Sequence, residues 1–216
     1  METIKVFIKS HPLLSYFALV FAISWGGMLI AAGPDGIQSY KELAFSYVAM
    51  LAGPSVAGIV LTGLVDGRAG LRELRSRLLK WRVGARWYAV ALLTAPLLFM
   101  AVLLGLSLIS PDFLPRIFVT EDKAALLQFS IVAALLVGIF EELGWTGFAV
   151  PKMRLRYGVL ATGLIVGFMF AAWDFLVVFW MTGATSEAGA LPMAIFMPAV
   201  LFTWLPAYRV LMVWVY

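Results

Sequence analysis

The chain has 216 residues, of which 63% are hydrophobic and only 13% are charged, and its mean hydropathy is +0.97. A soluble domain carries about 25% charged residues, so this composition excludes a soluble protein and favours a chain embedded in lipid. The lack of cysteine excludes disulfides, cysteine-ligated zinc and a thiol nucleophile, and a single histidine excludes a histidine-rich metal site within these residues. The net charge of +4 does not indicate nucleic-acid binding, because its distribution follows the predicted membrane topology.

Six stretches are long and apolar enough to cross a membrane as helices, since a crossing needs about 20 apolar residues. They are Leu13–Ala32, Leu43–Val65, Trp87–Ile109, Ala124–Val150, Gly158–Met181 and roughly Ala190–Leu205. The first is too long for the apolar core of a signal peptide and predicts a retained anchor. A last apolar stretch, Val210–Tyr216, predicts an incomplete final helix and a truncated protein. The predicted fold class is all-α: a polytopic membrane helix bundle, forming a single domain over residues 1–216.

Basic residues predict the orientation of these spans, because cytoplasmic loops are enriched in Lys and Arg. With the N-terminus in the cytoplasm, the outer side holds only Lys41, Arg116 and Lys123. The inner side then holds Lys5, Lys9, Arg68, Arg72, Arg75, Arg77, Lys80, Arg82, Arg86, Lys152, Arg154, Arg156 and Arg209. The sequence therefore predicts a multi-pass protein with a cytoplasmic N-terminus.

Two further patterns concern how the chain meets lipid and how its helices pack. Residues Asp66–Arg86 combine seven basic residues with leucines at helical spacing, which predicts an amphipathic helix on the anionic inner leaflet. A docking surface for a substrate tail or a partner is the alternative interpretation. Gly163 and Gly167 form a GxxxG pattern, which predicts close packing of two helices.

Three acidic residues lie within predicted spans: Glu141, Glu142 and Asp174. A charge near the bilayer centre costs about 2.5–3.5 kcal/mol on insertion scales, so such residues are candidates for function. Each helical residue turns by about 100°, which places Glu142 on one face with Thr146 and Glu141 on another with Trp145. Adjacent acids can therefore take different roles, one binding an ion and the other moving a proton.

The residues alone leave three interpretations of these acids open. A divalent cation could neutralise them and lower the pKa of a bound water toward roughly 7 for hydrolysis. A proton relay or ion path in a transporter, or neutral hydrogen-bonded packing elements, would fit the same pattern. By helical rise, Asp174 lies roughly 10 Å deeper than Glu141, so a shared ion requires a tilted or shifted helix.

The segment from Glu141 to Pro151, with the sequence EELGWTGFAVP, resembles the first motif of the CPBP intramembrane proteases. That family contains CAAX-processing endopeptidases and bacteriocin-processing or bacteriocin-immunity proteins, also called the Abi family. Its pattern is Glu-Glu-x-x-x-Arg, usually inside Glu-Glu-x-x-Trp-Arg-Gly. Weaker matches in the expected order are Leu51–Ser55, Asp66–Leu71, Leu79–Gly84 and Arg86–Tyr88.

The chain departs from the family pattern at three places. Thr146 occupies the arginine position of the first motif, and Thr cannot form the ion pair that would hold Glu142. The second motif, Phe-x-x-x-His, is represented by Phe170 and Asp174, so a carboxylate replaces the imidazole. The third motif supplies a further histidine on a last span, and it should follow Tyr216, where this sequence stops.

The resemblance implies an intramembrane endopeptidase that hydrolyses hydrophobic or lipidated peptides at the cytoplasmic side of a prokaryotic plasma membrane. It implies Glu141 as the general base and Glu142 as the second catalytic glutamate. It also implies a divalent metal, zinc by precedent, held by Asp174 with Glu142. The expected partners are the bilayer and a peptide, with no nucleic acid. Because two motif groups and a span are missing, we expect weak or no activity. A non-catalytic membrane binding or immunity protein and a proton-coupled transporter are the alternatives.

Overall fold

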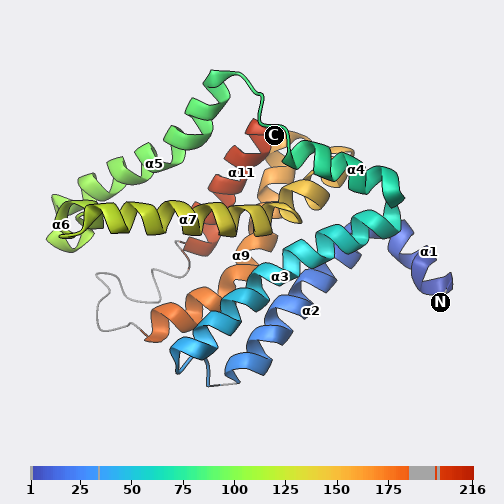
Figure 1. Ribbon diagram of the computed structural model, residues 1–216, viewed down its shortest axis with the longest axis horizontal. Helices are drawn as coiled ribbons and strands as arrows, with labels where there is room; N and C mark the ends of the chain where they lie inside the picture. Colours follow the sequence, from blue (N-terminus) through green and yellow to red (C-terminus); the bar gives the residue numbers. More distant parts are fainter. Residues whose placement is uncertain (1, 34, 185–197, 199) are drawn as a thin grey trace. The chain divides into compact units, whose positions relative to one another are not determined.

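The computed structural model describes residues 2–33, 35–184, 198 and 200–216, and these residues form helices and turns without a β-strand (Figure 1). The predicted all-α class is therefore confirmed. The chain divides into two compact units. The first contains residues 1–79, 139–214 and 216, and the second contains residues 80–138 and 215. The assignment of one domain to the whole chain stays a prediction.

Five segments are long and apolar enough to cross a membrane, in agreement with five of the six predicted spans. They are Pro12–Ala32, Tyr40–Val65, Ala85–Ser107, Lys123–Arg154 and Val159–Trp180. The sixth predicted span, Ala190–Leu205, falls largely outside the described residues. The predicted last stretch, Val210–Tyr216, is the second half of a helix that already begins at Leu205. The orientation of the spans stays a prediction.

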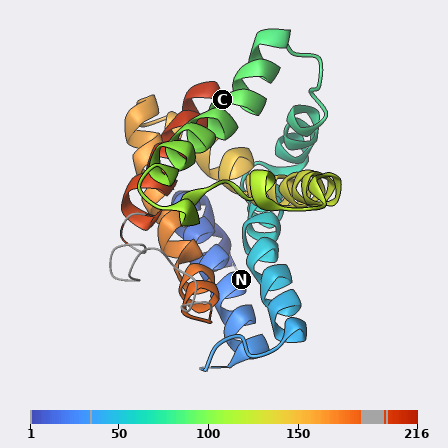
Figure 2. The same cartoon turned by 90° about the vertical axis from the view of Figure 1, so that its left-hand side faces the viewer.

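The first unit holds most of the packed interior. Its elements are α1 (Glu2–Ser10), α2 (Pro12–Ala32), α3 (Tyr40–Val65), α4 (Gly67–Leu78), the end of α7 (Lys123–Glu142), η2 (Trp145–Ala149), α8 (Val150–Arg154), α9 (Val159–Ala184), η3 (Val200–Trp204) and α11 (Leu205–Val215). Both η2 and η3 are single π-helical turns. Helices α2 and α3 lie side by side in both views of the molecule (Figures 1 and 2).

Local sequence signals fix where α3 begins. The Ser39 side chain accepts the backbone N–H of Glu42 at 3.2 Å, which satisfies an amide that has no partner inside the helix. The Glu42 carboxylate in turn accepts the backbone N–H of Gln38 at 2.7 Å. This reciprocal arrangement resembles a capping box, and it fixes the direction in which α3 leaves the preceding loop.

A chain of buried hydrogen bonds ties α2, α3 and α9 together. The indole N–H of Trp173 donates to Ser24 Oγ at 2.8 Å, and Ser24 donates to the carbonyl of Met50 at 2.9 Å. The indole N–H of Trp25 donates to the Trp173 carbonyl at 2.9 Å. A Cβ atom on Gly53 would lie 2.0 Å from Ser24 Oγ, so the network requires glycine there. These contacts place α9 against the α2–α3 pair.

The predicted amphipathic helix is shorter than Asp66–Arg86. Helix α4 ends at Leu78, and the next long helix begins at Ala85. A continuous helix would carry Gly84 in its interior, at a cost of about 1 kcal/mol relative to alanine, and the chain turns there instead. Leu74 of α4 is buried, whereas Leu71 and Leu78 of the same helix are exposed.

The second unit contains α5 (Ala85–Ser107), η1 (Pro111–Phe113), α6 (Arg116–Val119) and α7 as far as Gly138. Helix α5 has no buried residue, and neither does α7. Their surfaces are dominated by large aliphatic side chains, as expected for helices whose neighbour is lipid.

Candidate functional site

The two adjacent glutamates lie at the end of α7 rather than inside a longer helix. The predicted span Ala124–Val150 is interrupted after Glu142, where Leu143 and Gly144 form a turn before η2. The Gly144 amide bonds to the carbonyl of Glu141 at 3.2 Å instead of continuing the α-helical pattern. The carbonyl of Phe140, released from the helix, accepts Ser55 Oγ–H from α3 at 2.5 Å. The Ser55 hydroxyl thus replaces the backbone hydrogen bond that the Phe140 carbonyl loses at the turn.

Glycines allow this turn to approach α3 backbone to backbone. A Cβ atom on Gly144 would lie 2.2 Å from the carbonyl oxygen of Pro54 and 2.4 Å from the hydroxyl of Tyr16. A Cβ atom on Gly58 would lie 2.7 Å from the Gly144 Cα. Any larger residue at Gly58 or Gly144 would push the turn, and the glutamates before it, away from α3.

Glu142 is held by two donors from different elements. The Thr146 hydroxyl, one helical turn further on, donates to Oε2, so the predicted shared face is confirmed. The guanidinium of Arg209 donates from Nη1 to Oε1 at 2.6 Å. Both carboxylate oxygens of Glu142 are therefore engaged.

Arg209 is a site residue that the sequence analysis did not identify as one. It was counted with the cytoplasmic basic residues, but it is 1% exposed and lies between the glutamates and an aromatic floor. Its Nη2 is 3.7 Å from Glu141 Oε2, and its Cζ is 3.8 Å from the centre of the Phe170 ring. The guanidinium thus makes an ion pair on one side and a cation–π contact on the other.

The sequence did carry a signal for Arg209. It is the one charged residue in the apolar stretch Leu201–Val215. A lone ionisable residue in such a stretch is a functional candidate by the argument that singled out the glutamates. The sequence could not show which carboxylates it meets, since Glu142 precedes it by 67 residues.

The predicted GxxxG packing explains how Arg209 reaches the site. A Cβ atom on Gly163 would lie 2.6 Å from the Val210 Cα, and one on Gly167 would lie 2.5 Å from the Pro206 Cα. The two glycines of α9 therefore form the seat of α11, as close helix packing predicts. The same Cβ atom on Gly167 would lie 3.3 Å from the Arg209 Cβ, so this close helix packing fixes the base of the Arg209 side chain.

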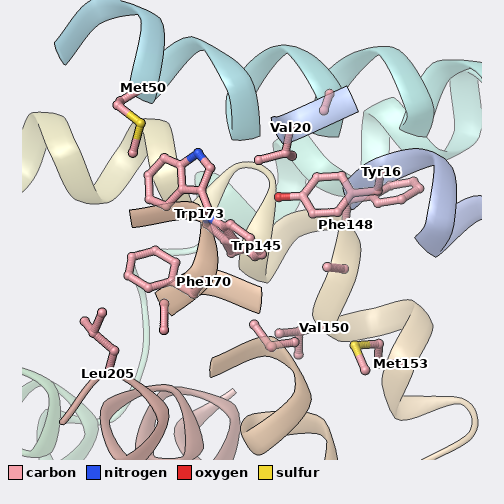
Figure 3. Close-up of a cluster of buried hydrophobic side chains, with 14 of the residues drawn as sticks. Tyr16, Val20, Met50, Trp145, Phe148, Val150, Met153, Phe170, Trp173 and Leu205 are labelled. Atoms are coloured by element: carbon pink, nitrogen blue, oxygen red, sulfur yellow. The ribbon is translucent and has the colours of Figure 1, made fainter. Parts of the chain in front are cut away.

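Tyr16, Trp145, Phe170 and Trp173 lie together in the buried hydrophobic cluster (Figure 3), which the Arg209 guanidinium contacts through Phe170. The ring of Trp145 packs edge-on against Tyr16 at 5.7 Å, Phe170 at 5.3 Å and Trp173 at 5.7 Å between ring centres. Among the described residues, five buried side-chain polar atoms have no hydrogen-bond partner, and three of them belong to this region: the Tyr16 hydroxyl, the Trp145 indole nitrogen and Arg209 Nε.

Asp174 lies near this cluster without joining it. It is half-buried on α9, four residues after Phe170, and the charge of Arg209 acts on it as well as on Glu141. No hydrogen bond or ion pair links it to Glu141 or Glu142 in the described structure. The structure therefore brings together Glu141, Glu142 and Thr146, and leaves Asp174 at the edge of the cluster.

The residues present do not fit a metal site. Within residues 2–33, 35–184, 198 and 200–216, no three His, Cys, Asp or Glu side chains are grouped so that they could hold an ion. The Glu142 carboxylate, an expected ligand, is bonded to a guanidinium, whose positive charge opposes a second cation beside it. The presence of zinc stays a prediction.

A pocket of about 460 Å³ opens beside the glutamate turn. It lies between the end of α3, α4 and the η2–α8 segment, with Gly147 in its wall. A Cβ atom on Gly147 would lie 3.3 Å from the backbone carbonyl of Glu142, but neither Glu141 nor Glu142 lines the pocket. Its lining combines apolar Leu74, Phe148 and Leu155 with charged groups.

Comparison with known proteins supports the resemblance at a coarse level. Over 70 residues the chain is 30% identical to CAAX prenyl protease 2 of Methanococcus maripaludis. This match covers 32% of the chain and about a fifth (21%) of the length of that protein. No protein-family model matches the chain, and no solved structure matches it. This partial similarity suggests a CPBP-like family.

Proposed function

We propose that this chain is a membrane-embedded peptidase of the CAAX-processing type, in which Glu141 takes a proton from the attacking water. The partial similarity to a CAAX prenyl protease supports the reaction class. The observation that carries the assignment of roles is the unequal bonding of the two glutamates. Both oxygens of Glu142 are bonded, whereas among the described residues the Glu141 carboxylate has only a long contact of 3.7 Å to Arg209.

This inequality suits a division of labour between neighbouring acids. A carboxylate with both oxygens bonded is a poor proton acceptor and a good structural anchor. A carboxylate that keeps a free oxygen beside a partly enclosed polar cluster can accept a proton from water. Glu142 then fixes the turn and Arg209, and Glu141 acts on the water.

The proposed reaction balances without a further reactant. As the water oxygen bonds to the peptide carbonyl carbon, one water proton passes to Glu141 and the carbonyl π electrons move onto oxygen. When those electrons return, the C–N bond breaks and the proton held by Glu141 passes to the departing amine. Glu141 is thereby regenerated as a carboxylate, ready for the next cycle.

The proposed substrate is a hydrophobic or lipidated peptide approaching from the predicted cytoplasmic side. The pocket beside Gly147 offers space for the polar end of such a peptide. Lys152 and Arg77 in its lining are paired with Asp66 and Glu73, and a terminal carboxylate would have to compete with these acids. A prenylated cysteine substrate follows from the name of the similar protein and not from any feature of this pocket.

A second function, non-catalytic peptide binding of the immunity type, is favoured by one specific observation. Arg209 pairs with both glutamates, and Asp174 stands where the resembled motif carries histidine, so the cluster would also serve as a polar core for a binding protein. Proton-coupled transport is the third alternative. It would be supported by proton flux in liposomes that depends on Glu141.

The test is cleavage of a panel of apolar and prenylated peptides by the protein in lipid nanodiscs. We expect Glu141→Gln to lower the cleavage rate at least about 100-fold with little change in thermal stability. Glu142→Gln should lower both, because it removes an anchor. Glu121→Gln, an exposed acid far along the chain, is the matched control. Cleavage that persists in Glu141→Gln would refute the mechanism, and peptide binding without turnover would favour the binding protein.

A further inference from the structure

We infer that Arg209 is the built-in counter-charge of the glutamate pair, and that Arg209 and Thr146 act together in holding the Glu142 carboxylate. The first observation is electrostatic. Two adjacent carboxylates, with side chains 18% and 23% exposed, meet one guanidinium that is almost fully enclosed. Arg209 can stay charged in such a place only because these carboxylates face it.

The second observation concerns the position of Thr146. It follows Glu142 by four residues, and its hydroxyl already reaches Glu142 Oε2. An arginine at position 146 would project from the same face and could pair with the same carboxylate. The chain places a neutral donor there and brings the positive charge from α11. The two residues therefore share the hydrogen bonding of Glu142, Thr146 at Oε2 and Arg209 at Oε1.

The third observation is that helix packing and an aromatic contact fix the position of Arg209. Gly163 and Gly167 let α11 lie against α9, which sets the Arg209 Cβ beside α9. The Phe170 ring then contacts the guanidinium, with its centre 3.8 Å from the Arg209 Cζ. The single positive charge of Arg209 offsets one of the two negative charges of the pair, and its contacts with both carboxylates make Arg209 a positioning residue for Glu141.

The experiment is a double-mutant cycle read by thermal unfolding in nanodiscs. Arg209→Ala should lower the unfolding midpoint by about 10 °C, because it leaves buried carboxylates unpaired. Thr146→Arg alone should also lower the midpoint, because it adds a second guanidinium beside an enclosed one, and the two like charges repel. In the Arg209→Ala background, Thr146→Arg should instead raise it and recover at least half of the loss. Arg72→Ala, which removes an exposed arginine, is the control and should leave the midpoint unchanged.

This reversal of sign separates a counter-charge from a packing role. If Arg209 only fills space over Phe170, Thr146→Arg will not rescue Arg209→Ala, and the inference is overturned. If Arg209→Ala yields no monodisperse protein, recovery of folded protein is the measure, and its return in the double variant has the same meaning. A variant carrying Glu142→Gln with Arg209→Ala should likewise be more stable than Arg209→Ala alone.

Metal content gives an independent measure. Protein purified without chelator should contain less than one zinc ion per chain, and added EDTA or Zn²⁺ should leave the unfolding midpoint unchanged. A stoichiometric ion whose removal lowers the midpoint would overturn the inference. Only the cleavage rate rests on the proposed function. A failed rescue with intact cleavage would reject the counter-charge, and a successful rescue without cleavage would reject the peptidase.

Discussion

Helices α5 and α9 are both strongly apolar, yet the protein covers them very differently. The most apolar window of α5 has a mean hydropathy of 2.5 and no buried residue. That of α9 has a mean hydropathy of 2.0, and 44% of its residues are buried. Within a chain this apolar, hydropathy therefore identifies spans but not the interior. Apolar burial alone does not favour contact with another helix over contact with lipid.

Small and polar residues account for the difference. Helix α9 contributes Gly163, Gly167 and the bonded indole of Trp173, while Gly105 in α5 has no atom within 4 Å of its ideal Cβ position. Close backbone approach and buried hydrogen bonds are what hold helices together in lipid. The cluster of Glu142 and Arg209 lies where those features converge.

The largest expected effect comes from Gly144→Ala, compared with Gly138→Ala six residues earlier. The Gly144 Cβ would lie 2.2 Å from a backbone oxygen of α3, which cannot move aside cheaply. We expect a loss of about 3 kcal/mol or more in unfolding free energy, together with displacement of Glu142. Gly138 has nothing within 4 Å, so Gly138→Ala should be neutral or stabilise α7 by about 0.5–1 kcal/mol. Equal effects of the two substitutions, measured by denaturant unfolding in micelles, would contradict the described packing.

A smaller effect is expected from Gly167→Ala, because α11 is short and can shift in response. The added Cβ would lie 2.5 Å from the Pro206 Cα and would push Arg209 away from the glutamates. We expect a loss of about 2 kcal/mol. Gly26→Ala in α2 is the control, since nothing lies within 4 Å of that position. If Gly167→Ala lowers stability and Thr146→Arg restores part of it, the loss includes the displaced charge. A loss that Thr146→Arg leaves unchanged would assign the whole effect to packing.

Ser24→Ala tests the hydrogen-bonded network of α2, α3 and α9. The substitution leaves the Trp173 indole N–H without its acceptor in a buried place, which should cost about 1–3 kcal/mol. Ser107→Ala in α5 removes an exposed hydroxyl that bonds only to the Leu104 carbonyl, so we expect a change within about 0.5 kcal/mol. Thermal unfolding of both variants in the same lipid checks the difference. A Ser24→Ala protein as stable as the Ser107→Ala protein would show that the network contributes little.

The sequence predicted much of the fold because its signals were local. Apolar length located five spans, and the Gly163–Gly167 spacing predicted a close helix contact that the structure confirms. Helical periodicity placed Thr146 beside Glu142, and the hydroxyl does reach that carboxylate. Each of these features depends on residues a few positions apart, so periodicity suffices to read them.

The rest of the site depends on contacts between distant segments. The break at Gly144 arises because α3 brings Pro54 against it, and only Ser55 explains how the released carbonyl is satisfied. Arg209 meets Glu142 across 67 residues, and a count of basic residues could not show that its side chain is buried. The zinc prediction followed the resembled motif and could not anticipate a guanidinium beside the expected ligand.

The smallest effect is expected from the other ion pair that joins distant segments, Lys152 with Asp66. The Lys152 Nζ lies 2.9 Å from Asp66 Oδ2, but the Asp66 side chain is 40% exposed. Water and salt screen such a pair, so Lys152→Met should cost less than about 1 kcal/mol, and the cost should shrink further at high salt. Methionine retains an apolar stem near Phe148, which isolates the charge. The Arg209–Glu142 pair should show no comparable salt dependence, because its guanidinium is enclosed. Similar salt responses for the two pairs would mean that Arg209 is hydrated, and the distinction between interior and surface charges would fail.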